Sequence, residues 1–117
     1  MFNLQQRDCI LINEALKALS DIATKAHAKI QQDFANIDPI VGVSRSMRKK
    51  GIPADAMTID CLKTNKRIII ILHDLEPEII HYQFSFTDQD PAERFEKLNF
   101  SDLTVNVLYG WIESYFQ

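Results

Sequence analysis

The residue types that most often carry chemistry gather between residues 73 and 81. The run HDLEPE covers residues 73–78, and His81 follows shortly after it. Imidazoles and carboxylates placed close together can bind a divalent metal or transfer protons. The spacing matches no HExxH helix, however, and His73 and His81 are expected to belong to two different strands. We therefore predict a solvated reversal between strands, with no metal ligand and no catalytic residue.

Nucleophilic or cofactor chemistry has even less support in the sequence. Cys61 is expected in mid-strand among apolar neighbours, which do not activate a thiol, and Cys9 has no base that can be assigned to it. The chain has three glycines and contains no GxSxG, P-loop or GxGxxG motif. We expect no cofactor, and we favour a non-enzymatic protein. A small enzyme or ligand carrier with a pocket near His73 and His81 is an alternative.

A second candidate chemistry is contact with anions through a short basic segment. Its members are Arg45, Arg48, Lys49 and Lys50. These cations also suit the last turn of a short helix, where the macrodipole is negative, so a structural role explains them equally well. The segment contains no aromatic residue that could stack on a base. A weak nucleic-acid binder that uses residues 45–50 is therefore a second alternative, and we do not expect nucleic acid as the partner.

Aromatic residues are concentrated in the C-terminal third, and they give the main indication of a role. More of them fall there than two thin layers of structure can hide, and surplus aromatic side chains at a surface typically mark a protein interface. The candidates for such an interface are Tyr82, Phe84, Phe86, Trp111, Tyr115 and Phe116.

The elements that must position these residues begin with a long amphipathic helix, predicted over residues 8–36. Its apolar stripe is wide enough to serve two surfaces. One row covers the sheet, and the other packs against the C-terminal helix or against a second copy of the chain. The residues proposed for a dimer seam on this helix are Leu11, Ala15, Ala18 and Ile22.

The centre of the predicted sheet is the run RIIIILH at residues 67–73. Large β-branched residues in succession favour a strand that is covered on both faces, and we expect helices of this chain or of a second copy to cover them. Alternating patterns predict neighbouring strands over residues 56–63 and 78–87, with a tight turn at Thr64-Asn65 between the first two. The short connections imply a three-stranded antiparallel meander.

Three further helices complete the predicted α+β fold. The first covers residues 43–50 and ends at Gly51, with Ile52 and Met47 as the apolar pair of a Schellman motif. The second covers residues 91–98, because Asp-Pro-Ala-Glu is a typical helix start. The third covers residues 102–116 and contains Gly110, which suggests a backbone pressed close to another element.

Composition limits the class of protein. The 117 residues suffice for one domain (1–117), and a net charge of −3 with 46% hydrophobic residues is ordinary for a soluble protein. Two cysteines without a CxxC pair fit free thiols in a reducing cytoplasm, and no run of residues is long and apolar enough for a membrane span. We expect a cytoplasmic protein of the adaptor, small-chaperone or inhibitor type that forms a homodimer and binds an unidentified protein partner.

Overall fold

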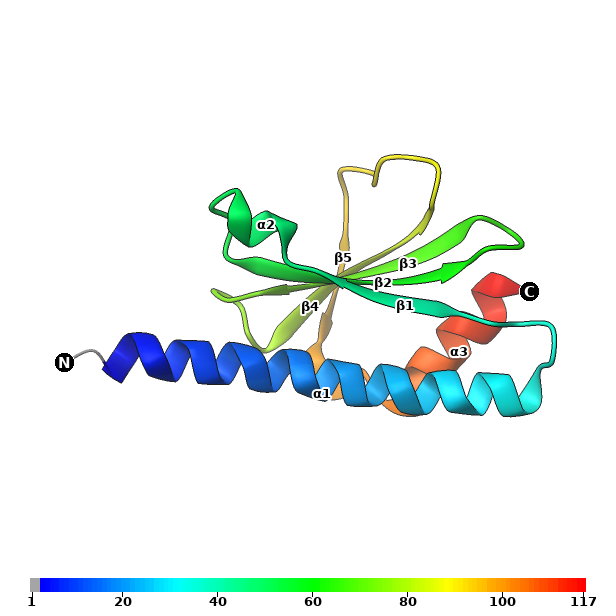
Figure 1. Cartoon of the computed structure of the whole chain (residues 1–117), viewed down its shortest axis with the longest axis horizontal. Helices are drawn as coiled ribbons and strands as arrows, with labels where there is room; N and C mark the ends of the chain where they lie inside the picture. Colours follow the sequence, from blue (N-terminus) through cyan, green and yellow to red (C-terminus); the bar gives the residue numbers. More distant parts are fainter. Residues whose placement is uncertain (1–2) are drawn as a thin grey trace.

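The computed structural model is an α+β fold in which a five-stranded antiparallel sheet packs against helices (Figure 1). The structure describes the backbone of residues 3–117 and the side chains of residues 14–117. The elements in chain order are α1 (Asn3–Asp33), β1 (Ile40–Ser44), α2 (Ser46–Lys49), β2 (Ala54–Cys61), β3 (Lys66–His73), β4 (Ile79–Phe86), β5 (Glu96–Asn99), the 3₁₀-helix η1 (Phe100–Asp102) and α3 (Val105–Phe116).

The strands follow one another in sequence order across the sheet, from β1 to β5. The isoleucine-rich strand β3 lies in the middle, as predicted, and the three predicted strands are confirmed to within two residues at each end. Asn65 adopts a positive φ of 57° in the β2–β3 turn, which is the role that the sequence indicated for it. The number of strands is wrong, because a further strand pairs at each edge of the meander.

The first additional strand, β1, replaces the front of the helix predicted over residues 43–50. Ile40, Val41 and Val43 are β-branched and pair with β2, so only Ser46–Lys49 forms a helical turn. The predicted end of that helix is confirmed. Gly51 has a φ of +87°, and the Ile52 N–H donates to the Met47 carbonyl at 2.9 Å, as a Schellman motif requires.

The second additional strand, β5, contradicts the helix predicted over residues 91–98. Residues 90–95 form a loop that is held by a side chain of the sheet. The Gln83 amide donates to the carbonyls of Ala92 and Arg94 at 3.1 and 2.8 Å, and its oxygen accepts from the Ala92 N–H at 2.9 Å. The two carbonyls are acceptors that a helix over residues 91–98 would need for its own hydrogen bonds, so their bonds to Gln83 overrule the local helix-start pattern.

Both long helices lie on the same face of the sheet, and the core lies between them and the strands. Alternate residues of β3 point toward this face, and Ile68 and Ile70 are fully buried there. From α1, the buried residues are Leu19, Ala23, Ala26 and Ile30, at helical spacing. The helix α3 packs along α1, so the C-terminal helix occupies space that a second copy would otherwise fill.

The outer face of the sheet is covered differently from the prediction, since neither long helix lies on it. Ile69 is nevertheless 6% exposed. It is flanked across the strands by Thr58 and Gln83, and the loop over residues 87–95 folds back onto Gln83. A five-stranded sheet therefore shields its central strand with neighbouring side chains and one loop, where the sequence suggested a second layer of helices.

The long helix α1 begins and ends earlier than predicted and spans 31 residues, which is about 46 Å at 1.5 Å per residue. It accounts for most of the 52 Å long axis of the molecule, and its first turns extend past the sheet (Figure 1). The helix α3 begins three residues later than predicted, because Thr104 caps it by accepting a hydrogen bond from the Val107 N–H. Among the described residues, no helix combines the length and the apolar character that crossing a bilayer requires.

Candidate functional site

The two histidines singled out in the sequence meet on the outer face of the sheet. The rings of His73 and His81 lie 4.9 Å apart in an edge-to-face arrangement, and His81 Nε2 is 3.7 Å from the Glu76 carboxylate. Burial lowers the pKa of His81, as do the neighbouring His73 and Lys97, while Glu76 opposes the shift. His81 Nδ1 is buried and forms no hydrogen bond among the described residues.

This histidine cluster lacks the space and the ligands of a chemical site. The cavity beside His73 and Glu76 measures about 20 Å³, which is room for one water molecule. Within the part of the chain that the structure describes, no group of three or more His, Cys, Asp or Glu side chains is arranged to hold a metal ion. The geometry therefore gives no support to a substrate pocket near His73 and His81.

The basic segment is tied into a network of ion pairs at the start of β2. Asp55 is 1% exposed and accepts two hydrogen bonds from the Arg48 guanidinium, at 2.8 and 3.0 Å. Arg45 contacts the same carboxylate at 3.2 Å, and Arg48 also donates two bonds to Asp74, at 2.6 and 2.7 Å. The two arginines therefore anchor α2 to the sheet, whereas the neighbouring Lys49 and Lys50 are exposed.

The electrostatics of this network are those of a structural site. Burial alone would raise the pKa of Asp55, but the hydrogen bonds and positive charge of Arg48, together with Arg45, hold it below its ordinary value. The pKa of Arg48 is raised, first by its hydrogen bonds to Asp74 and then by those to Asp55. Because carboxylates already compensate the two arginines, the segment offers phosphates chiefly Lys49 and Lys50, and two lysines make a weak phosphate-binding surface.

Four of the aromatic residues form one stacked cluster where β4 meets α3, which we name the aromatic cluster: Tyr82, Phe84, Trp111 and Tyr115. Residues 82 and 84 are two apart on a strand, and 111 and 115 are four apart on a helix, so each pair shares one face. The ring of Tyr82 stacks on Trp111 at 4.5 Å and that of Phe84 on Tyr115 at 5.0 Å, while Phe84 meets Trp111 edge-on at 5.6 Å.

Polar contacts hold the aromatic cluster in place. The Tyr115 hydroxyl donates to the Ser85 carbonyl at 2.6 Å, and burial raises the pKa of that hydroxyl. Lys66 donates to the Tyr115 carbonyl at 3.0 Å, and its Nζ lies 5.1 Å from the centre of the Tyr115 ring, within the range of a cation–π contact. These contacts attach the C-terminal end of α3 to β3 and β4.

The exposure of the predicted interface residues divides them into two groups. Phe84 is 42% exposed and Phe86, at the end of the same strand face, is 39% exposed. Phe116, in contrast, is buried in the core, so it cannot take part in an interface as we expected. Phe84 and Phe86 form an apolar patch at the open margin of the aromatic cluster.

The dimer seam predicted on the long helix has less surface to offer than the sequence suggested. Ala15 and Ile22 pack against the core, and Ala18 is exposed on its own. The Leu11 side chain lies outside the described residues. Two polar contacts tie the far end of α1 to α3: Tyr109 donates to the Asp33 carboxylate at 2.7 Å, which raises the Tyr109 pKa to about 12, and Lys29 donates to Asn106 at 3.1 Å.

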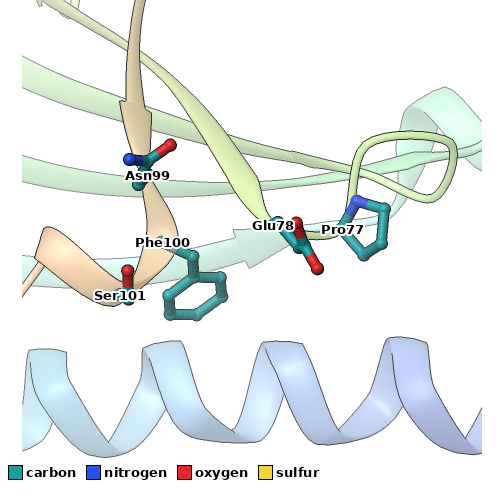
Figure 2. A pocket seen from close by; sticks show the side chains of 5 residues that line it. All are labelled: Pro77, Glu78, Asn99, Phe100 and Ser101. Carbon is teal, nitrogen blue, oxygen red and sulfur yellow. The ribbon is translucent and has the colours of Figure 1, made fainter.

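An open pocket of about 530 Å³ lies at the β5 edge of the sheet, between the β3–β4 turn and the end of β5 (Figure 2). Its lining consists of Pro77, Glu78, Asn99, Phe100 and Ser101, and the Phe100 ring points toward α1. Its volume falls in the range of ligand sites, but four of the five lining residues are exposed, and they do not enclose a ligand with apolar walls. We assign it no chemistry.

The surface that sequence reasoning missed is the edge strand β1. Its apolar residues Ile40, Val41 and Val43 are between 38% and 49% exposed. The signal was present as three β-branched residues after Pro39, but the stronger Schellman pattern that follows favoured a helix.

Comparison of the chain with protein-family models, with curated proteins and with solved structures finds no significant match.

Proposed function

We propose that this chain is a non-enzymatic protein-binding domain, of the adaptor, small-chaperone or inhibitor type, whose partner binds at the aromatic cluster. The observation that carries the proposal is the pair of neighbouring phenylalanines, Phe84 and Phe86, which stay about 40% exposed beside a stack of immobilised rings. Apolar patches at a surface typically mark protein interfaces, and aromatic residues dominate their energetics.

The size of the expected contribution follows from the exposed area. A Phe side chain buries about 200 Å² when fully covered, so covering the exposed two fifths removes about 80 Å² from water. At about 25 cal/mol per Å², each phenylalanine contributes about 2 kcal/mol to the association. The rings around Phe84 are already fixed by stacking, so little side-chain entropy is lost on binding. An apolar segment of another protein is the partner that fits this surface.

The rival functions have less support. A nucleic-acid binder would need several cations that are available to phosphates, whereas two of the four in this segment, Arg45 and Arg48, contact Asp55. An enzyme with a pocket near His73 and His81 would need more volume than the cavity of about 20 Å³ beside His73. We also propose that the chain forms a homodimer, which is a separate part of the proposal. A reducing, cytoplasmic location is a third part, and the free thiol of Cys61 supports it.

The experiment compares a double variant of the patch with a matched control. Phe84→Ser with Phe86→Ser removes the patch, and Ile52→Ser with Leu75→Ser removes two exposed apolar residues at the opposite end of strands β2 and β3. The wild type and the control should retain the same partner from lysate of the source organism. For the purified partner, calorimetry should show at least 100-fold weaker binding to the patch variant, in line with about 2 kcal/mol per residue.

A single substitution guards against loss of folding in the double variant, since Phe84 also stacks on Tyr115. Phe86→Glu places a charge on the patch and leaves those stacked rings unchanged, and it should weaken binding at least tenfold while circular dichroism stays that of the wild type. If the folded patch variants bind the partner as tightly as the wild type, the aromatic cluster is not the binding surface and the proposed function is wrong.

A further inference from the structure

The edge strand β1 lacks the usual protection of a sheet edge. Its sequence Ile-Val-Gly-Val-Ser contains no charge and no proline, and apolar side chains project from both of its faces. The opposite edge, β5, carries Glu96 and Lys97, which is a common way to prevent pairing with another strand. An uncharged, exposed edge is a template for a further strand.

The register of the sheet shows which backbone groups of β1 point outward. In an antiparallel sheet, alternate residues bond to the strand on one side, and the residues between them bond to the other. The Asp74 N–H donates to the Pro53 carbonyl, so odd-numbered residues of β2 bond to β3 and even-numbered ones bond to β1. Since Gly42 pairs with Thr58, the backbone groups of Val41 and Val43 are directed away from the sheet.

We propose that β1 pairs antiparallel with β1 of a second copy of this chain, about a two-fold axis at Gly42, to form a continuous ten-stranded sheet. In this register Val41 of each copy lies opposite Val43 of the other, and the outward groups of these residues make four backbone hydrogen bonds. Gly42 lies opposite Gly42 on the axis, where two strands approach most closely and the absence of a side chain leaves room.

Pairing of β1 with β1 of a second copy also covers part of the exposed apolar surface of this strand, which belongs to Ile40, Val41 and Val43. Five residues per copy make a contact well below the ~800 Å² per partner of a standard interface, so we expect a weak dimer with a Kd between about 10 μM and 1 mM.

The inference rests on the homodimer part of the proposed function and is independent of the aromatic cluster. Light scattering from about 10 μM to 1 mM should show a particle that rises from 13.5 kDa toward twice that mass. Val43→Pro removes an outward N–H and no bond within the sheet, so the variant should fold and remain a monomer. Leu75→Ser, at an exposed turn position, is the control and should dimerise like the wild type.

A charge-pair comparison tests the register without proline. Val41→Lys with Val43→Lys sets like charges opposite one another across the axis and should weaken dimerisation at least tenfold. Val41→Glu with Val43→Lys carries the same number of charges on the same strand but sets opposite charges together, and it should dimerise within threefold of the wild type.

Crosslinking at the axis tests the register directly. With Cys9 replaced by Ser, Gly42→Cys should form an intermolecular disulfide under mild oxidation, because residues opposite each other in a non-hydrogen-bonded pair lie at a distance suited to one. Ser44→Cys, which would lie opposite Ile40 of the second copy, should not. A 13.5 kDa particle at every concentration overturns both the inference and the proposed homodimer. A dimer that persists unchanged in Val43→Pro and in the double-lysine variant overturns only the inference.

Discussion

The ion-pair network at the start of β2 gives the most exacting test of the structure, through the substitution Asp55→Asn. The change keeps the shape of the side chain and removes the one carboxylate that Arg45 and Arg48 share. Asp55 is 1% exposed, so water cannot replace the lost charge. If the arginines serve the fold, the loss appears as reduced stability.

The magnitude follows from burial and from the contacts that survive. Removing one partner of a buried ion pair costs roughly 3–5 kcal/mol. Arg48 keeps its two bonds to Asp74 and is about a quarter exposed, so we expect the lower end, about 3 kcal/mol. An unfolding entropy of about 2.1 cal/mol/K per residue amounts to about 0.25 kcal/mol/K for 117 residues, and the melting temperature should fall by about 12 °C.

The assay is urea and thermal unfolding at neutral pH, with Asp60→Asn as the matched control. Asp60 lies on the same strand and accepts two bonds from Arg67, at 2.7 and 2.8 Å, but this pair is on the more exposed outer face. Its loss should cost about 1 kcal/mol. The reasoning is refuted if Asp55→Asn is no less stable than Asp60→Asn.

The same network predicts a pH dependence whose sign is fixed. The pKa of Asp55 is lower in the folded chain than its ordinary value of 3.8. The stabilisation by its carboxylate is therefore fully present above pH 3.8 and is lost as the pH falls below that value. The stability difference between the wild type and Asp55→Asn should therefore shrink below about pH 4. A difference that stays constant down to pH 2.5 would show that the carboxylate charge is not what Arg48 requires.

Two further predictions address individual residues. The lowered pKa of His81 means that, as the pH falls, the unfolded chain takes up a proton at this residue before the folded chain does. The stability is therefore full above pH 6.5 and decreases as the pH falls from there through the lowered pKa of the folded state. Between pH 7.5 and pH 5.5, urea unfolding should show a larger loss of stability for the wild type than for His81→Gln, and an equal loss would contradict this prediction. Gly110→Ala should raise the free energy of unfolding by about 0.5–1 kcal/mol, because a Cβ at this position meets nothing within 4 Å. The sequence had suggested instead that the backbone at Gly110 is pressed close to another element. A destabilised variant would support that earlier interpretation.

The elements that the sequence predicted well are those whose pattern is local and strong. The isoleucine run could only be a buried strand, and the turn at Thr64-Asn65 fixed its partner. The Schellman ending at Gly51 was predictable down to its hydrogen bonds, because all of its participants lie within six residues. Boundaries of long helices were less exact, since several consecutive residues suit a helix end equally well.

The elements that were missed depend on contacts between residues far apart in the chain. An Asp-Pro-Ala-Glu sequence normally begins a helix, but no local rule could show that Gln83 binds the backbone of Ala92 and Arg94. Likewise, the basic segment was recognisable, but the pairing of its two arginines with Asp55 and Asp74 depends on how α2 meets the sheet. From the sequence alone, the charges of the basic segment could therefore be interpreted as a nucleic-acid-binding surface, which the structure does not favour.

The candidate binding surface was foreseen in part, because the surplus of aromatic residues could be counted and their arrangement could not. Tyr82 and Trp111 stack on one another, whereas Phe84 and Phe86 stay exposed at the margin of the aromatic cluster. The edge strand β1 lies on the far side of β2 and β3 from these phenylalanines. The two proposals are therefore compatible: pairing through β1 would leave both aromatic clusters uncovered, and a dimer would present two copies of the same binding surface. A weak dimer could then bind an oligomeric partner far more tightly than either copy alone, since the second contact is made at a high effective concentration.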